Sequence, residues 1–452
     1  MLIFTTWRAE SFSHPALSSP PSTYNPAMRR SSFPYLTALT VSGVLVALAG
    51  CSSDATSPPL SLPSTTIPEA RVDDGVLTIG VLTPQGSANA DIGQAIRSAV
   101  ALAVNKINTS GGYDGSRVVL VTEDEGVAGI GVDPAIAALL DAHVDAIIGP
   151  ASSTNALAGL GEIVNAGVVS CSPTASASLL DGFPDHNLFF RTIPSDSMQA
   201  LAIAEAVDRT GASRATVAYI DDAFGQLFVD SVDKALRQKD IEQSASVPYS
   251  ADNRSIDEAA TRIAKMTAGV VVVIGDATSG PVMLGEIDAK SGDTRPVYVI
   301  NDAMRRPTAS AEPMGGSLAS RVTGVSPVAY ATDKEFLTEL GAGQDDPSPY
   351  AANAFDCVNL IALAALAAHS TQPTLIAAQI PAVSDSGTPC MTFTDCRADL
   401  LAGSNIDYDS PAGPAGALTL ASNGDLSAAV FELFGFDDAG RDYNKGTVSV
   451  HV

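Results

Sequence analysis

Two stretches rich in small hydroxyl side chains are the most chemically suggestive part of this sequence. The first is "IIGPASSTNA", in which Ser152, Ser153 and Thr154 stand between a short apolar run and a helical pattern. Free N–H groups in the first turn of a helix, together with the helix dipole, favour a negative group such as a carboxylate. The hydroxyl of Ser153 would add a further donor. The alternative is that Ser153 only caps its helix.

The second stretch is "SCSPTASAS", where Ser172, Thr174 and Ser176 follow another short apolar run. Pro173 restricts the backbone at this point, so that the Thr174 carbonyl and the Ser176 hydroxyl can face one point. In open α/β sheets, ligands bind outside the carboxyl ends of the strands. Two such clusters on neighbouring strand ends therefore predict a polar binding pocket that includes Ser153, Thr174 and Ser176.

The second half of the chain offers complementary groups at its own strand ends. Phe224 in "DDAFG" can supply an apolar wall, and Asp302 in "INDAM" can supply a negative charge for an ammonium group. The alternatives are ordinary core packing for Phe224 and a turn position for Asp302. Together with the hydroxyl clusters, these residues predict a site for a small zwitterion.

Motifs for catalysis and cofactor binding are missing from the sequence. It has neither His-Glu-x-x-His nor Gly-x-Ser-x-Gly nor a Walker-type phosphate loop, and its 5 histidines are scattered. The segment "GVAGIGVDP" lacks the third glycine of a dinucleotide fingerprint and indicates a turn before a helix. We therefore expect a protein that is not an enzyme and has no metal or cofactor.

The elements that must position these groups alternate between strands and helices. A β-branched run at Val76–Leu82 is followed by apolar residues at three- and four-residue intervals from Ile92 to Ile107, a pattern typical of an amphipathic helix. Similar units repeat up to about residue 170, and a second series begins near Ser195. Short buried strands that alternate with helices predict an α/β fold with parallel sheets, in two Rossmann-like lobes.

Composition limits the classes of partner. The net charge is −25, with 50 acidic against 25 basic residues, which argues against nucleic acid because phosphates would be repelled. The hydrophobic fraction of 46% is ordinary for a soluble globular protein. We expect no stretch after Cys51 to be long and apolar enough to span a bilayer.

The N-terminal region has the pattern of an export signal. Arg29 and Arg30 precede a short apolar run that ends in "LAGC" at Cys51, which looks like a bacterial lipobox and implies lipid attachment at that cysteine. The alternative is a buried N-terminal helix that ends in a cysteine. We assign residues 1–50 to a leader and signal peptide and residues 51–73 to a tether, and leave open whether translation starts at Met1 or Met28.

Four further cysteines allow three pairings. Cys390 and Cys396 close a short polar loop, "CMTFTDC", so we expect a disulfide between them in an exported protein. Cys171 and Cys357 lie in apolar stretches, and we expect both to be small buried thiols.

The sequence from about Leu77 to Gly440 resembles the branched-chain amino-acid binding proteins, which have the type I periplasmic binding protein fold. The resemblance rests on segments in the family's order, which include "GVLTPQGSANADIGQAIRSAVALAVNKINTSGG", "AIIGPASSTNALA", "VVSCSPTASASLL", "FFRTIPSD", "YIDDAFGQ" and "DYDSPAGPAGALTLASNGDL". It implies that the chain crosses three times between two lobes. The expected first lobe is 74–190 plus 327–412, and the expected second lobe is 191–326 plus 413–452.

The resemblance also implies roles for individual residues. The carboxylate-binding serine of the family matches Ser153, its paired carbonyl and hydroxyl match Thr174 and Ser176, its aromatic matches Phe224, and its ammonium-binding acid matches Asp302. The sequence departs from the family at Ile92, where an aromatic residue is common, and at Asp276 and Ala277, where a second aromatic would fall. We therefore expect the ligand to be an amino acid or another small polar solute, such as an amide or urea.

The function implied is that of an extracytoplasmic, lipid-anchored solute-binding protein of an ABC importer. We expect a monomer that is held to the cell membrane through Cys51 and presents its ligand to the transporter permease. The alternative is a lipoprotein of the same fold that senses the ligand and acts through a signalling partner.

Overall fold

The computed structural model describes residues 64–67, 71–86, 89–266, 269–305, 316–328, 333–341, 348–409 and 418–452. The chain divides into two units, Met1–Pro59 and Leu60–Val452, and all described residues belong to the second unit. The predicted leader, the proposed lipid-bearing Cys51 and most of the predicted tether lie outside the described residues. At the end of that tether, the Asp73 carboxylate accepts hydrogen bonds from the hydroxyls of Ser370 and Thr371, at 2.6 and 2.8 Å.

The first sheet is entirely parallel, in the order β2-β1-β3-β4-β5. Its strands are short, and those at its centre are fully buried, as expected for a parallel sheet that is covered on both faces. They are β1 (Thr78–Thr83), β2 (Val119–Asp124), β3 (Ala146–Ile148), β4 (Val169–Ser172) and β5 (Phe189–Arg191).

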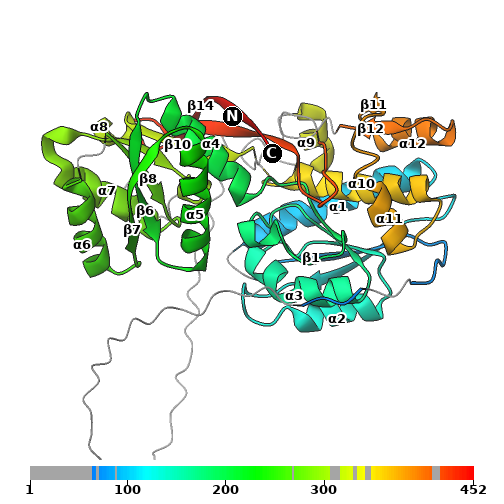
Figure 1. Ribbon diagram of the computed structural model, residues 1–452. Helices are drawn as coiled ribbons and strands as arrows, with labels where there is room; N and C mark the ends of the chain where they lie inside the picture. Colours follow the sequence, from blue (N-terminus) through cyan, green and yellow to red (C-terminus); the bar gives the residue numbers. More distant parts are fainter. Residues whose placement is uncertain are drawn as a thin grey trace, which may run out of the picture. The chain divides into compact units, whose positions relative to one another are not determined.

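Helices cover both faces of this sheet (Figure 1). On one face pack α1 (Ala90–Thr109) and α10 (Ala351–Ala368), and on the other pack α2 (Asp133–Asp141) and α3 (Ser153–Asn165). The apolar positions of α1 that the sequence pattern predicted, from Ile96 to Ile107, are buried in the core. This half is a Rossmann-like unit.

The second sheet has the order β14-β13-β10-β9-β8-β6-β7 and is mixed rather than purely parallel. Its parallel strands are β6 (Arg214–Ile220), β7 (Glu242–Tyr249), β8 (Val270–Ile274), β9 (Val297–Ile300) and β10 (Val322–Pro327). The C-terminal hairpin of β13 (Ala428–Phe436) and β14 (Asp442–His451) pairs antiparallel at one edge.

Four helices flank this sheet, in pairs that belong to different apolar clusters (Figure 1). One pair is α4 (Asp196–Asp208) and α5 (Ala223–Gln238), and the other is α6 (Asn253–Ala264) and α7 (Ser279–Ser291). The shorter elements nearby are η1 (Ser178–Leu180), η2 (Gly292–Thr294), η3 (Asp302–Met304) and α8 (Gly316–Ala319).

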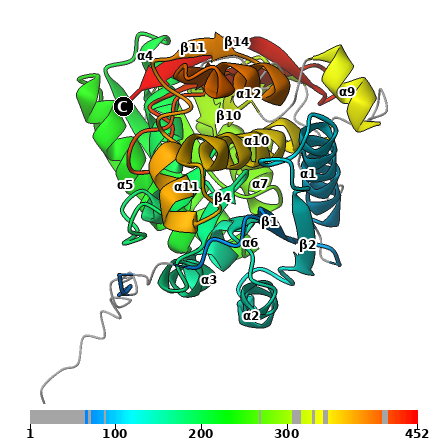
Figure 2. The same ribbon diagram turned by 90° about the vertical axis from the view of Figure 1, so that its right-hand side faces the viewer.

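After β10 the chain returns to the first half. It forms α9 (Lys334–Leu340), α10, α11 (Pro373–Gln379) and α12 (Phe393–Leu401), with a small parallel pair, β11 (Thr388–Cys390) and β12 (Ile406–Tyr408). Helix α10 contacts α1, α11 and α12 (Figure 2). The chain then goes back to the second sheet for β13, so the order of elements requires three crossings. The predicted α/β fold with two Rossmann-like lobes is confirmed, while the exact lobe boundaries stay a prediction.

Helix α10 corrects one expectation from the sequence. Its 18 residues have a mean hydropathy of 1.6, so by length and composition it is apolar enough to cross a membrane. However, 89% of it is buried inside the fold. Its hydrophobicity follows from its position in the protein core, where it has apolar neighbours around most of its circumference.

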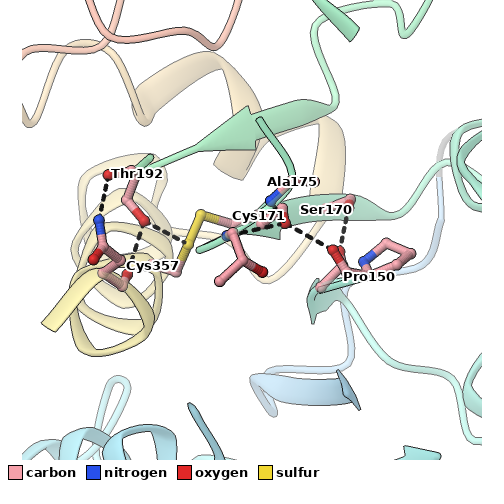
Figure 3. The surroundings of a disulfide bond; sticks show 10 residues. Pro150, Ser170, Cys171, Ala175, Thr192 and Cys357 are labelled. Carbon is pink, nitrogen blue, oxygen red and sulfur yellow. Dashed lines mark hydrogen bonds between the residues drawn. A yellow bond between two sulfur atoms is a disulfide. The ribbon is translucent and has the colours of Figure 1, made fainter. Parts of the chain in front are cut away.

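The cysteine pairing corrects a second expectation. The structure contains the predicted Cys390–Cys396 disulfide. Cys171 and Cys357 also form a disulfide, with their Cα atoms 5.8 Å apart, so the prediction of two free thiols is wrong (Figure 3). The apolar setting of each cysteine was identified correctly, since both are buried. What the sequence did not reveal is that β4 and α10 pack directly against each other.

Candidate functional site

The N-terminus of α3 meets the loop after β4. Ser152 is the N-cap residue, and its hydroxyl oxygen accepts a hydrogen bond from the Asn155 N–H at 3.4 Å. Ser153 is the first helical residue, and its hydroxyl oxygen accepts from the N–H of Ala177 at 3.2 Å. The helix is therefore capped by Ser152 and not by Ser153, the alternative that the sequence left open. The side chain of Ser153 instead joins two neighbouring loops.

Hydrogen bonds from the loop after β4 complete this connection. The Thr174 hydroxyl donates to the Ala151 carbonyl at 2.7 Å, and the Ser172 hydroxyl donates to the Pro150 carbonyl at 2.7 Å. The Ser172 oxygen also accepts from the Ala175 N–H at 3.0 Å. Pro150 and Ala175 lie beside the Cys171–Cys357 disulfide (Figure 3). The structure thus brings together Ser153, Thr174 and Ser176, which the sequence predicted to share a pocket edge.

Glu125 is a member of this cluster that the sequence reasoning missed. It is only 2% exposed, and its carboxylate accepts from the N–H groups of Ala151 and Ser152, at 2.7 and 3.1 Å. Burial raises the pKa of Glu125 to about 7, although these hydrogen bonds oppose the shift. The signal in the sequence was the acidic run "TEDEG" at the end of a strand, since Glu125 directly follows β2.

Glu125 decides which donors remain for a ligand. Its carboxylate already uses the N–H groups of Ala151 and Ser152. Among the described residues, no partner is found for the N–H groups of Ser153, Thr154 and Ser176. These backbone donors, at the N-terminus of α3 and in the loop after β4, can therefore bind a carboxylate.

Asp196, at the start of α4, is the second group that the sequence reasoning missed. Its N–H donates to the Ser176 carbonyl at 2.8 Å, and the nearby Ser176 hydroxyl opposes the rise in the pKa of its carboxyl group. Burial, together with the nearby charge of Asp302, raises the pKa of Asp196 to about 7. The Ser176 hydroxyl thus interacts with Asp196. The Ser176 N–H remains as the donor that a ligand can use at this residue.

Asp302 opens η3 and is half-buried. Its carboxylate accepts from the side-chain amide of Gln199 at 2.8 Å, and the same amide nitrogen donates to the Val325 carbonyl at 2.8 Å. Burial raises the pKa of Asp302, and the Gln199 hydrogen bond opposes this shift. Asp196 and Asp302 come from different elements and interact unfavourably when both are ionised. A cation between them would relieve that repulsion.

Phe224 is the second residue of α5 and is half-buried. Its ring lies 5.4 Å from that of Phe228, in a tilted arrangement, and it packs against both large apolar clusters. These contacts are those of core packing, the alternative that the sequence left open.

A buried arginine holds the loop of the site in place. The Arg191 side chain is fully buried and forms ion pairs with Asp181 and Asp425, the latter at 2.6 Å. Its guanidinium also donates to the carbonyls of Ala175 and Ala177, at 3.4 and 3.2 Å. Because Arg191 touches the residues on either side of Ser176, it fixes the backbone that presents the Ser176 N–H.

Within the described part of the chain, no group of three metal-ligating side chains comes together. The arrangement can instead hold a small anion through backbone donors and a small cation through a carboxylate pair.

Comparison with known proteins gives the family. The family model "Periplasmic binding protein" matches residues 76–401. Among curated proteins, glutamate receptor 3.1 of Oryza sativa is 27% identical over 205 residues, which cover 44% of this chain and 21% of the receptor. The Leu/Ile/Val-binding protein BraC3 of Rhizobium johnstonii is 26% identical over 214 residues, which cover 47% of this chain and 58% of that protein. The match therefore spans only about a fifth of the receptor's length and less than two thirds of the length of BraC3.

Solved structures share the fold over most of the chain. An ABC transporter substrate-binding protein of Desulfitobacterium hafniense in complex with Leu has a TM-score of 0.62 and 21% identity, and the match covers 82% of this chain and 99% of that one. A solute-binding protein of R. palustris in complex with benzoate has a TM-score of 0.59 and 18% identity, with 84% and 98% covered. The two sheets, the three crossings and the family match over residues 76–401 lead to one conclusion: this chain belongs to the periplasmic binding proteins, a family that binds ligands rather than transforming them, and has their type I fold.

Proposed function

We propose that this protein is an extracytoplasmic solute-binding protein of an ABC importer and that its solute is a small carboxylate, foremost an amino acid. The observation that carries the proposal is the pairing of free backbone donors at Ser153, Thr154 and Ser176 with the carboxyl groups of Asp196 and Asp302. The donors suit a carboxylate, and the acid pair suits an ammonium group.

The acid pair gives the ammonium a specific energetic role. Without a cation, burial raises the pKa of both Asp196 and Asp302, and the charge of Asp302 raises the pKa of Asp196 further. An ammonium group next to them favours their ionised forms, so that binding is coupled to the release of a proton. Calorimetry in buffers of different ionisation enthalpy measures this release directly.

The solutes of related structures support this ligand class. Similar folds have been solved with Leu, with isoleucine and with benzoate. These ligands share a carboxylate and an apolar body, and benzoate lacks the ammonium. A benzoate-like solute would use the donors of Ser153 and Ser176 and would not need Asp302. Asp302→Asn separates the two cases, because it weakens the binding of an amino acid but not that of an aromatic acid.

A sensing role is the second candidate. The observation that favours it is the match to a glutamate receptor over 205 residues. In that role the ligand-bound protein acts on a signalling partner instead of a permease. Uptake of labelled solute by cells that lack the protein distinguishes the two, since transport is lost only if the protein serves an importer.

The proposed location outside the cytoplasm fits the two disulfides, which persist in oxidising compartments. We propose that Cys51 carries the lipid anchor, on the basis of the "LAGC" pattern. Replacement of Cys51 by Ala should abolish fatty-acid labelling and release the protein from the membrane fraction. Unchanged labelling would contradict the anchor.

The decisive experiment identifies the ligand itself. Small molecules released from gently purified protein are identified by mass spectrometry, and their binding is then measured by calorimetry. Recovery of an amino acid or an aromatic acid that binds again supports the proposal. A neutral sugar or a nucleoside would contradict it, because neither supplies a carboxylate for the donors of Ser153, Thr154 and Ser176.

A further inference from the structure

A pocket lies in the lobe that contains the first sheet, among residues other than those of the candidate ligand site. It has a volume of about 630 Å³ and is lined by residues of α1, α9 and α10 and by residues 391–395, at the start of α12. None of the residues of the candidate ligand site lines it. Its chemistry must therefore be considered separately.

Aromatic and apolar side chains form part of its walls. Phe336 of α9 and Phe355 of α10 lie edge to face, with ring centroids 5.3 Å apart, and Phe393 is buried next to Cys396 of the short disulfide loop. Met391, which also lines the pocket, is 53% exposed. A ligand with an apolar body would find matching surface here.

One buried polar atom in the wall has no partner. Asn359 is 1% exposed, and its amide nitrogen donates to the Tyr408 hydroxyl at 2.8 Å. Its side-chain oxygen makes no hydrogen bond within the described part of the protein. A buried carbonyl without a donor costs free energy, and this cost is recovered when a ligand supplies an N–H group. Asn359 lies one turn from Phe355 on the same helix, so one ligand can reach both.

The charges around the pocket favour a cation. Its lining contains Lys106 and four acidic residues, namely Asp333, Glu335, Glu339 and Asp395. Lys106 pairs with Glu339 at 2.6 Å, while Asp333 and Asp395 accept hydrogen bonds near the starts of α9 and α12. Three carboxylates thus remain without a cation among the described residues, and they leave a negative field at the pocket.

We propose that this pocket is a second binding site, which takes a small primary amine with an aromatic or branched apolar body. The apolar body packs against Phe336, Phe355 and Met391. The ammonium group donates to the side-chain oxygen of Asn359 and is attracted by the surrounding carboxylates. The site is separate from the proposed solute site, so it does not depend on the identity of that solute.

The test is NMR of the whole protein with 13C-methyl methionine, titrated with 2-phenylethylamine. The Met391 signal is assigned by its loss in Met391→Leu. We expect a saturable shift of this signal, with at least five-fold weaker binding of the neutral 2-phenylethanol and of the anionic 3-phenylpropanoate. Asn359→Leu should weaken amine binding by about ten-fold or more, because a hydrogen bond to a charged group is lost.

Surface variants keep the test independent of folding. Glu335→Gln, a change at an exposed position, should weaken amine binding by roughly two- to five-fold, the range for an exposed charge interaction. Glu258→Gln, at an exposed site on α6, is the matched control and should leave amine binding unchanged.

Three results would overturn the proposal. The first is equal binding of amine and alcohol, which would mean that no cation is recognised. The second is unchanged amine binding in both Asn359→Leu and Glu335→Gln. The third is loss of the Met391 shift in Asp302→Asn, which would place the amine in the solute site.

Discussion

The two disulfides should contribute very unequally to stability. Cys171 and Cys357 are 186 residues apart in the sequence, whereas Cys390 and Cys396 are 6 apart. A disulfide stabilises mainly by restricting the unfolded chain, and the effect grows with the logarithm of the loop length. The relation gives about 5 kcal/mol for the long loop and about 2 kcal/mol for the short one.

The perturbation is a pair of double alanine variants, one for each disulfide. Both variants remove two mostly buried sulfur atoms, so the packing loss is similar and the difference of about 3 kcal/mol isolates the loop effect. Unfolding entropy is about 2 cal/mol/K per residue, or about 0.8 kcal/mol/K for a chain of about 400 residues. The melting temperature should therefore fall by about 6 °C without the long-range disulfide and by about 2–3 °C without the short one.

Differential scanning calorimetry and chemical unfolding, with the wild type under oxidising conditions as reference, measure both losses. Peptide mapping under non-reducing conditions first establishes that both bonds are present. The reasoning is refuted if loss of the short disulfide lowers the melting temperature as much as loss of the long one.

Four further substitutions test the solute site and its supports. Asp302→Asn should weaken the binding of an amino acid by roughly two to three orders of magnitude, because the ammonium group enclosed in the site loses its negative partner. Ser153→Ala should weaken the binding free energy measured by calorimetry by only about 1–3 kcal/mol, since the backbone donors remain. Arg191→Met should destabilise the protein by about 3–5 kcal/mol in urea unfolding, because it leaves the carboxylates of Asp181 and Asp425 without their cation; an unchanged unfolding midpoint would contradict this role. The pKa of Glu125 is raised from an ordinary 4.5 to about 7, so the native state binds its proton more tightly than the unfolded state does, and the stability from this difference is complete below about pH 4.5 and lost as the pH rises through 7. In the wild type, the free energy of unfolding should therefore fall between about pH 4.5 and 7, and in Glu125→Gln this fall should be smaller by on the order of 3 kcal/mol. If the wild type and Glu125→Gln show the same dependence of stability on pH, Glu125 is ionised normally in the native state.

The sequence determined the architecture because its signals are local and periodic. Runs such as "VVVVI" at Val270–Ile274, short and rich in β-branched residues, are typical of buried strands, and the spacing from Ile96 to Ile107 is typical of one apolar helix face. The alternation of such units was sufficient to predict two α/β lobes. The hydroxyl clusters at the ends of β3 and β4 were equally local, and they identified the place where Ser153, Thr174 and Ser176 meet.

The tertiary structure decided which groups are already occupied. Whether the Ser176 hydroxyl faces a ligand or Asp196, and whether Glu125 takes the N–H groups of Ala151 and Ser152, depends on contacts between segments that are distant in sequence. Such contacts follow from the packing of sheets and helices, and no pattern within one segment encodes them.

The same reason explains the cysteines. The apolar surroundings of Cys171 and Cys357 are visible in the sequence and predict burial, which the structure has. Their bond requires β4 and the Ala-rich α10, far apart in the chain, to pack with the two Cα atoms 5.8 Å apart. Cys390 and Cys396 could be paired from the sequence because a loop of a few residues already keeps them close. Interactions between residues close in sequence thus determine the helices, the strands and the short disulfide loop. The pairing of residues far apart in sequence is decided only by the packing of the tertiary structure.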